Sequence, residues 1–304
     1  MDDYSRAWYE LKLRNEYLER RGAEFQLLFV RIMSLCHPNG DFIPTRPWGN
    51  IGDRKNDGYL KSMRTLFQVY APDQMNSLKT ITKIDEDFFG ALPFWREHFD
   101  IWVFVHNARD GLSPDVEQKL LDLEGAHQHI RLRHWWFPDL RGKIFSLSQT
   151  DIASLLGPIP SRTDILNIQV PELSVIVQHI AGLSEPPVPD LRPPSPRKLL
   201  ANGLSPGVRF LLSVGMVSGH RVGEFFNGYH DLTLGDRVAA ALTREYERLR
   251  NAGTLPDNIF ASLQAFVCGS PPAPPARQAT ALVILAYLFE ECDIFERPPE
   301  VSEP

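Results

Sequence analysis

The chain lacks several features that would identify a specialised protein class. Cysteine occurs three times, at Cys36, Cys268 and Cys292, which is too few and too scattered for a disulfide framework or a CxxC metal site. No apolar run reaches the roughly 18–20 residues of a membrane span, and the charged N-terminus has no apolar signal core. Basic residues are not in excess, since 32 Lys and Arg stand against 38 Asp and Glu, for a net charge of -6. These absences predict a cytoplasmic protein without membrane segments, whose overall charge does not attract nucleic acid.

A glycine-rich phosphate loop is also missing. The sequence GNIGDRKNDG at 49–58 has neither Walker nor Rossmann spacing, which disfavours a small-molecule enzyme built around such a loop. The histidines give no clear metal signal, because His127, His129 and His134 have no supporting carboxylate or cysteine spacing.

Proline is concentrated in one place. The segment EPPVPDLRPPSPRK at 185–198 has six prolines in fourteen residues, which predicts a semi-rigid linker because proline fixes φ and removes a backbone donor. A chain of 304 residues is long enough for two domains. We therefore predict an N-terminal domain at 1–184, the linker at 185–198 and an all-α domain at 199–304.

Hydrophobic periodicity predicts an α/β first domain. One helical face is formed by the apolar residues of 21–36, and strands are predicted at 58–61, 66–71, 101–106 and 130–136. The other predicted helices span 73–89, 113–124, 150–156, 170–183, 206–217, 234–251, 256–268 and 276–291.

The first two strands carry the residues most suited to chemistry. If they pair as a hairpin, Asp57 lies near Gln68, and Tyr70 shares the Gln68 face because side chains on one face recur every two residues. Mg²⁺ needs only one or two carboxylates, since water and phosphate complete its shell. Glu24 precedes Leu28 by four residues, so we expect it on the buried face of its helix, where a carboxylate requires a partner. The alternative for Asn56-Asp57-Gly58 is a simple turn.

Three segments together resemble a known nuclease family. RGAEFQ on the first helix, GDRKNDG and the strand FQVYAP are similar to the motifs of restriction-endonuclease-like PD-(D/E)xK nucleases, particularly Mrr-like members, over about residues 20–135. Glu24, Asp57 and Gln68 match the helix Glu, the GxDG Asp and the Gln of the QxK strand. The resemblance implies a mixed sheet flanked by helices, and hydrolysis of DNA phosphodiesters with Mg²⁺ or Mn²⁺ held by these three residues.

Tyr70 departs from the family pattern, which has lysine at this position. A tyrosine hydroxyl donates a hydrogen bond but carries no positive charge. Lys61, four residues beyond Asp57, or the nearby Lys55 would have to supply the missing cation. Without such a replacement, the chain would be a catalytically inactive scaffold or DNA-sensing subunit that keeps the nuclease fold.

The C-terminal half carries a second resemblance. GHRVGEFFNGY, LPDNIFASLQAF and ALVILAYLFEECDIFERP are similar to the C-terminal helical module of effector subunits in bacterial ABC-three-component antiphage systems of the Lamassu group. The resemblance implies an SMC-like ABC ATPase and a small middle subunit as partners, and self-assembly of the released effector as a homo-oligomer. The sequence therefore predicts a DNA endonuclease that its partner subunits restrain.

Overall fold

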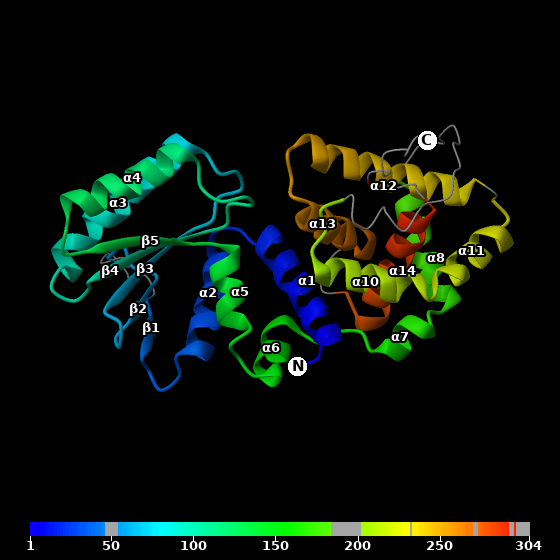
Figure 1. Ribbon diagram of the computed structural model, residues 1–304, viewed down its shortest axis with the longest axis horizontal. Helices are drawn as coiled ribbons and strands as arrows, with labels where there is room; N and C mark the ends of the chain where they lie inside the picture. The colour runs from blue at the N-terminus through cyan, green and yellow to red at the C-terminus, as the bar shows by residue number, and fades with distance from the viewer. Residues whose placement is uncertain (46–53, 184–201, 232, 270–272, 292–294, 296–304) are drawn as a thin grey trace, which may run out of the picture. The chain divides into compact units, whose positions relative to one another are not determined.

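The computed structural model describes residues 1–45, 54–183, 202–231, 233–269, 273–291 and 295, and the predicted linker at 185–198 lies outside this described part. The chain divides into two compact units (Figure 1). A sheet-containing unit spans Glu16–Gly157, and a helical unit combines Met1–Asn15 with Pro158–Pro304. Helix α1 (Asp3–Glu19) supplies residues to both units. Residues 158–183 cluster with the C-terminal helices, whereas the sequence-based division assigned them to the first domain.

The sheet has five strands in sequence order: β1 (Phe42–Pro44), β2 (Gly58–Leu60), β3 (Thr65–Tyr70), β4 (Ile101–His106) and β5 (Arg131–Trp135). The pairs β1–β2 and β2–β3 are antiparallel, and β3–β4 and β4–β5 are parallel. The fold is therefore α/β with a mixed sheet. The predicted hairpin is confirmed as β2–β3, and the short apolar run IWVFVH is the interior strand β4, which lies between β3 and β5.

Helices cover both faces of this sheet (Figure 1). On one face lie α3 (Ser77–Trp95) and α4 (Pro114–Ala126), which share a core with alternate residues of β3 and β4. On the other face lies α2 (Gly22–Cys36), whose Phe29 ring packs 5.3 Å from the ring of Phe67 in β3. Two short helices, α5 (Phe137–Ile144) and α6 (Gln149–Leu156), complete the unit. Sequence periodicity does not find β1 or α5, because three and eight residues are too few to establish a period.

The helical unit surrounds one almost fully buried helix, α14 (Pro275–Glu290), in which every residue from Gln278 to Ala286 is buried. A helix that is apolar on all sides belongs in the middle of a core. Around it are α7 (Arg162–Leu166), α8 (Val170–Ala181), α10 (Pro206–Met216), α11 (Gly219–Gly228), α12 (Leu234–Asn251) and α13 (Pro256–Cys268). The all-α prediction for this region is confirmed. Within the described part of the chain, no helix is long and apolar enough to cross a membrane.

Candidate functional site

Asp57 directly precedes β2, and the register of the hairpin determines what lies beside it. The register of the hairpin ends where Gly58 pairs with Phe67, and the N–H of the preceding Asp57 donates to the carbonyl of the same Phe67 at 2.9 Å. The Asp57 side chain is buried, and its Oδ2 accepts the backbone N–H of Val69 at 2.6 Å. The Asp57 carboxylate is thus tied to β3 at Val69, the residue that follows Gln68.

The Asn56-Asp57-Gly58 segment forms a local turn, which is the alternative interpretation of this sequence. Asn56 is fully buried, and its side-chain oxygen accepts the Gly58 N–H at 2.8 Å while its amide donates to Thr45 Oγ1 at 2.9 Å. Glycine is required at position 58 because a Cβ there would lie 2.4 Å from the Phe42 ring. The turn fixes the backbone on each side of Asp57 and thereby orients its carboxylate.

Gln68 and Tyr70 lie on the α3 side of the sheet. The Gln68 side chain is 4% exposed, and its buried Oε1 has no hydrogen-bond partner among the described residues. Tyr70 packs its ring 6.0 Å from that of Phe104. Burial, together with the nearby negative charge of Asp87, raises the pKa of Tyr70. Tyr70 is therefore a neutral hydrogen-bond donor at physiological pH.

The prediction that Glu24 projects onto the buried face of its helix is wrong. Glu24 lies in the first turn of α2 and is exposed. At 3.6 residues per turn, residues four and eight positions apart differ by about 40° and 80° around the axis, so the alignment of Glu24 with Leu28 and Ile32 degrades along the helix. The residue of α2 that reaches Asp57 is Gln26, whose Nε2 donates to Asp57 Oδ1 at 2.5 Å.

The two lysines proposed as replacement cations have different positions. Lys61 is exposed in the β2–β3 turn, and a strand of four residues separates it from Asp57 by about 13 Å, so the structure does not bring them together. Lys55 instead reaches α3, where its Nζ lies 3.0 Å from Asp87 Oδ1. No sequence motif pointed to Asp87, or to its second partner Lys83, whose Nζ lies 2.8 Å from Asp87 Oδ1.

The donor set can be compared with the needs of a magnesium ion. The site offers one carboxylate, that of Asp57, and one buried amide oxygen without a partner, that of Gln68. Mg²⁺ is commonly bound through one or two carboxylates while water and phosphate oxygens supply the rest, so a carboxylate and an amide oxygen are the donor types that a minimal site would use. Three or more clustered His, Cys, Asp or Glu side chains able to hold a metal ion do not occur in the described ranges. The α2 side chain that contacts Asp57 is Gln26, whereas Glu24 was the residue expected there.

A buried histidine ends β4 next to this site. His106 is paired with Tyr70 in the parallel register, its Nδ1 accepts the Ala108 N–H at 3.2 Å, and its Nε2 lies 3.1 Å from His134 Nδ1. His134 Nε2 in turn lies 3.2 Å from Glu117 Oε1 in α4. These contacts require the proton on Nε2 of both rings, so that His106 Nε2–H donates to His134 Nδ1 and His134 Nε2–H donates to Glu117. Burial, with the neighbouring His134, lowers the pKa of His106 to about 3, so both ring nitrogens of a neutral His106 serve structural contacts.

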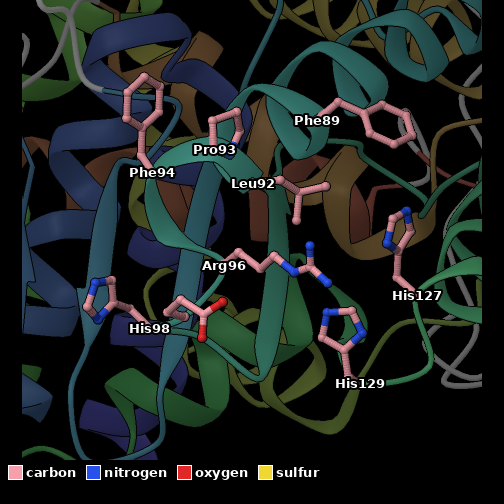
Figure 2. Close-up of a pocket in the computed structure, with 9 residues that line it drawn as sticks. Phe89, Leu92, Pro93, Phe94, Arg96, His98, His127 and His129 are labelled. Carbon is pink, nitrogen blue, oxygen red and sulfur yellow. The ribbon is translucent and has the colours of Figure 1, made fainter.

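A cavity of about 490 Å³ lies at the C-terminal half of α3. In Figure 2 the Arg96 side chain points toward His129, and Phe89 lies above His127. The His127 ring contacts the Phe88 ring at 5.0 Å and the Phe89 ring at 5.9 Å. The His127 ring thus packs against two aromatic rings of α3.

Comparison with known proteins identifies the C-terminal region. Residues 172–296 match the family model of C-terminal domain 10 of the ABC-three component (ABC-3C) systems. No curated protein and no solved structure matches the chain. The matched range begins in α8 and includes α10 to α14, which agrees with the second resemblance seen in the sequence. The match supports membership of this chain in an ABC-three component system, and such systems involve several protein subunits.

Proposed function

We propose that this chain is the DNA-cleaving effector subunit of an ABC-three component antiphage system, with a restriction-endonuclease-like nuclease in its sheet-containing unit. The observation that carries the proposal is the buried Asp57 carboxylate, which accepts the N–H of Val69 in β3, next in the chain to Gln68, whose buried amide oxygen has no hydrogen-bond partner among the described residues. A polar atom left unpaired in a buried position costs free energy, so this unpaired oxygen supports a ligand site here.

The residues around this pair have separate roles in the proposed reaction. Asp57 and Gln68 would hold Mg²⁺ or Mn²⁺, which when bound supplies Lewis-acid activation of a phosphoryl oxygen. The Val69 N–H and the Gln26 amide orient the Asp57 carboxylate. Tyr70 keeps its proton because its pKa is raised, so its hydroxyl can donate to a phosphate oxygen. An SMC-like ABC ATPase and a small middle subunit are the proposed partners, bound through the helical unit.

The test is cleavage of plasmid DNA by the full chain, alone and co-purified with the other subunits of its system, in Mg²⁺, in Mn²⁺ and in EDTA. Asp57→Asn keeps the shape of the side chain and removes its charge, so we expect cleavage to fall by at least about 100-fold, the size of the loss when one strong electrostatic contact to a reaction is removed. The matched control is Asp100→Asn, because Asp100 is an exposed carboxylate of the same unit that pairs with Arg64. Cleavage that survives Asp57→Asn would refute the assignment of the site.

A second candidate is a catalytically inactive, DNA-binding scaffold with the same fold. Two observations favour it. The Asp57 carboxylate already accepts two N–H donors, one of them from the Gln26 amide, and Tyr70 occupies the position of the family's lysine. This candidate predicts DNA binding by the complex with no cleavage under any metal condition, so the same assay, with a binding measurement added, separates the two.

A further inference from the structure

Asp87 is a fully buried carboxylate that neither sequence motif includes. Its Oδ1 lies 3.0 Å from Lys55 Nζ and 2.8 Å from Lys83 Nζ. Burial of an ionised carboxylate is expensive unless it is paired, which explains the two ammonium groups. Two positive charges against one negative charge leave the cluster with an excess of one positive charge.

This cluster lies over the carboxyl end of β3. Helix α3 runs back along the sheet, since Trp95 near its end packs on Tyr59 at 5.9 Å, whereas residues of its first half surround Tyr70. Asp87 is near enough to Tyr70 for its charge to raise the pKa of the hydroxyl. The excess positive charge is therefore on the same face of the sheet as Gln68 and Tyr70.

A cavity of about 300 Å³ opens between Tyr70 and the first half of α3. Its lining residues are Tyr70, Leu78, Lys79, Thr82, Lys83 and Glu86. Lys79 and Lys83 are four residues apart, so they lie on one side of the helix. The Lys79 side chain is exposed and makes no ion pair with any described residue. The lining thus offers two ammonium groups and a phenol hydroxyl as hydrogen-bond donors, against one carboxylate.

Two buried oxygens on the same side of the sheet lack hydrogen-bond donors in the described part of the chain. Asp87 Oδ2 and Gln68 Oε1 have no hydrogen-bond partner among the described residues. Both are acceptors, so each would be satisfied by a donor such as an ordered water.

We propose that this cavity binds a backbone phosphate of DNA, with Lys79 and Lys83 supplying the positive charge that Tyr70 lacks and Asp87 acting as the positioning residue for Lys83 and Lys55. The proposal deepens the proposed function and takes its ligand, DNA, from it. It does not require that cleavage occurs.

The test is fluorescence anisotropy of a short labelled DNA duplex with the full chain, alone and with its co-purified partner subunits, in EDTA. The plot of log K against log salt has a negative slope, and each lost phosphate contact makes it shallower by about 0.9. Between about 50 and about 200 mM salt, one contact therefore accounts for about a 3.5-fold change in affinity. We expect Lys79→Gln and Lys83→Gln each to weaken binding at low salt and to reduce the slope by about 0.9. Inorganic phosphate, as a competitor, distinguishes a site for free phosphate from a site for DNA.

The matched control is Lys119→Gln. Lys119 is a partly buried lysine of the same unit that pairs with Asp85 at 2.7 Å, so its substitution removes the same charge away from the cavity. We expect its salt slope to equal that of the wild type. The proposal is overturned if Lys83→Gln binds DNA with the wild-type slope, if free phosphate competes while DNA affinity ignores both lysines, or if the wild type does not bind DNA at about 50 mM salt.

Asp87→Asn tests the positioning role, because the two explanations of Asp87 predict opposite signs. If Asp87 were only a negative charge near DNA, its removal would strengthen binding. If it holds Lys83 at the cavity, its removal weakens binding, which is the result we expect. If the lysine variants keep the wild-type salt slope while cleavage still depends on Asp57, this inference alone is refuted. If the lysine variants change the salt slope but no DNA is cleaved, only the nuclease proposal is refuted.

Discussion

Substitution of Asp87 by asparagine is the sharpest test of how the sheet-containing unit is held together. Asparagine has the same shape, so the change removes a charge without opening a cavity. The carboxylate is 0% exposed, whereas the side chains of Lys55 and Lys83 are 38% and 29% exposed. On losing their counter-ion, both lysines regain water only in part.

The expected magnitude lies between two known limits. Removal of one partner from a fully buried ion pair costs about 3–5 kcal/mol, and from an exposed pair about 0–1 kcal/mol. For a buried carboxylate with partly exposed partners we expect a loss of about 2 kcal/mol in the free energy of unfolding. With a urea slope of about 2 kcal/mol/M, the midpoint moves down by about 1 M.

Tryptophan fluorescence in urea is a suitable assay, because Trp95, Trp102, Trp135 and Trp136 lie in this unit. The control is Asp85→Asn, two residues away on α3, whose carboxylate is 35% exposed in its pair with Lys119. We expect it to cost less than about 1 kcal/mol. Equal midpoints for the two variants would show that burial of Asp87 does not set the strength of its pairing.

Two further predictions concern other parts of the chain. A Cβ at Gly215 of α10 would lie 2.8 Å from Ala286 Cβ in α14. Gly215→Val should therefore destabilise the helical unit by about 2 kcal/mol and lower its melting temperature, measured by circular dichroism. The control is Gly228→Val, which should not lower it, because a Cβ at Gly228 has nothing within 4 Å. His106 stays neutral in the folded chain, with a pKa of about 3 against about 6.5 when unfolded, so the unfolded state binds the extra proton. Stability from this group is present above about pH 6.5 and is lost as pH falls toward 3, and His106→Gln should reduce the loss between pH 7 and pH 5 by up to about 2 kcal/mol in urea unfolding. An unchanged pH dependence would contradict the buried neutral state.

The sequence was most informative where the pattern is local. The β2–β3 hairpin follows from two short apolar runs around a turn, and its register pairs Gly58, the residue after Asp57, with Phe67, the residue before Gln68. The buried strand β4 and the buried helix α14 follow from continuous apolar runs of the right lengths.

The sequence failed where the contact partner comes from a distant element. Gln26 and Asp57 are 31 residues apart, and Lys55 and Asp87 are 32 apart, so no periodic pattern links them. One signal was nevertheless present. Asp87 follows the buried Ile84 by three residues and precedes the buried Ala91 by four, so it lies on the apolar face of α3. The argument that we applied to Glu24 was correct for Asp87 instead.

The division of α1 between the two units has a consequence for module exchange. Arg14 donates to Asn258 Oδ1 at 2.6 Å, and Asn15 donates to Gln264 Oε1 at 2.7 Å, while Trp8 is fully buried, so the first residues of the chain complete the helical unit. Residues 16–157 are therefore an insertion within that unit. A chain begun at Pro158 would lose part of its own core, and a different effector module could be substituted only by rejoining the chain at two junctions, near Asn15 and near Pro158.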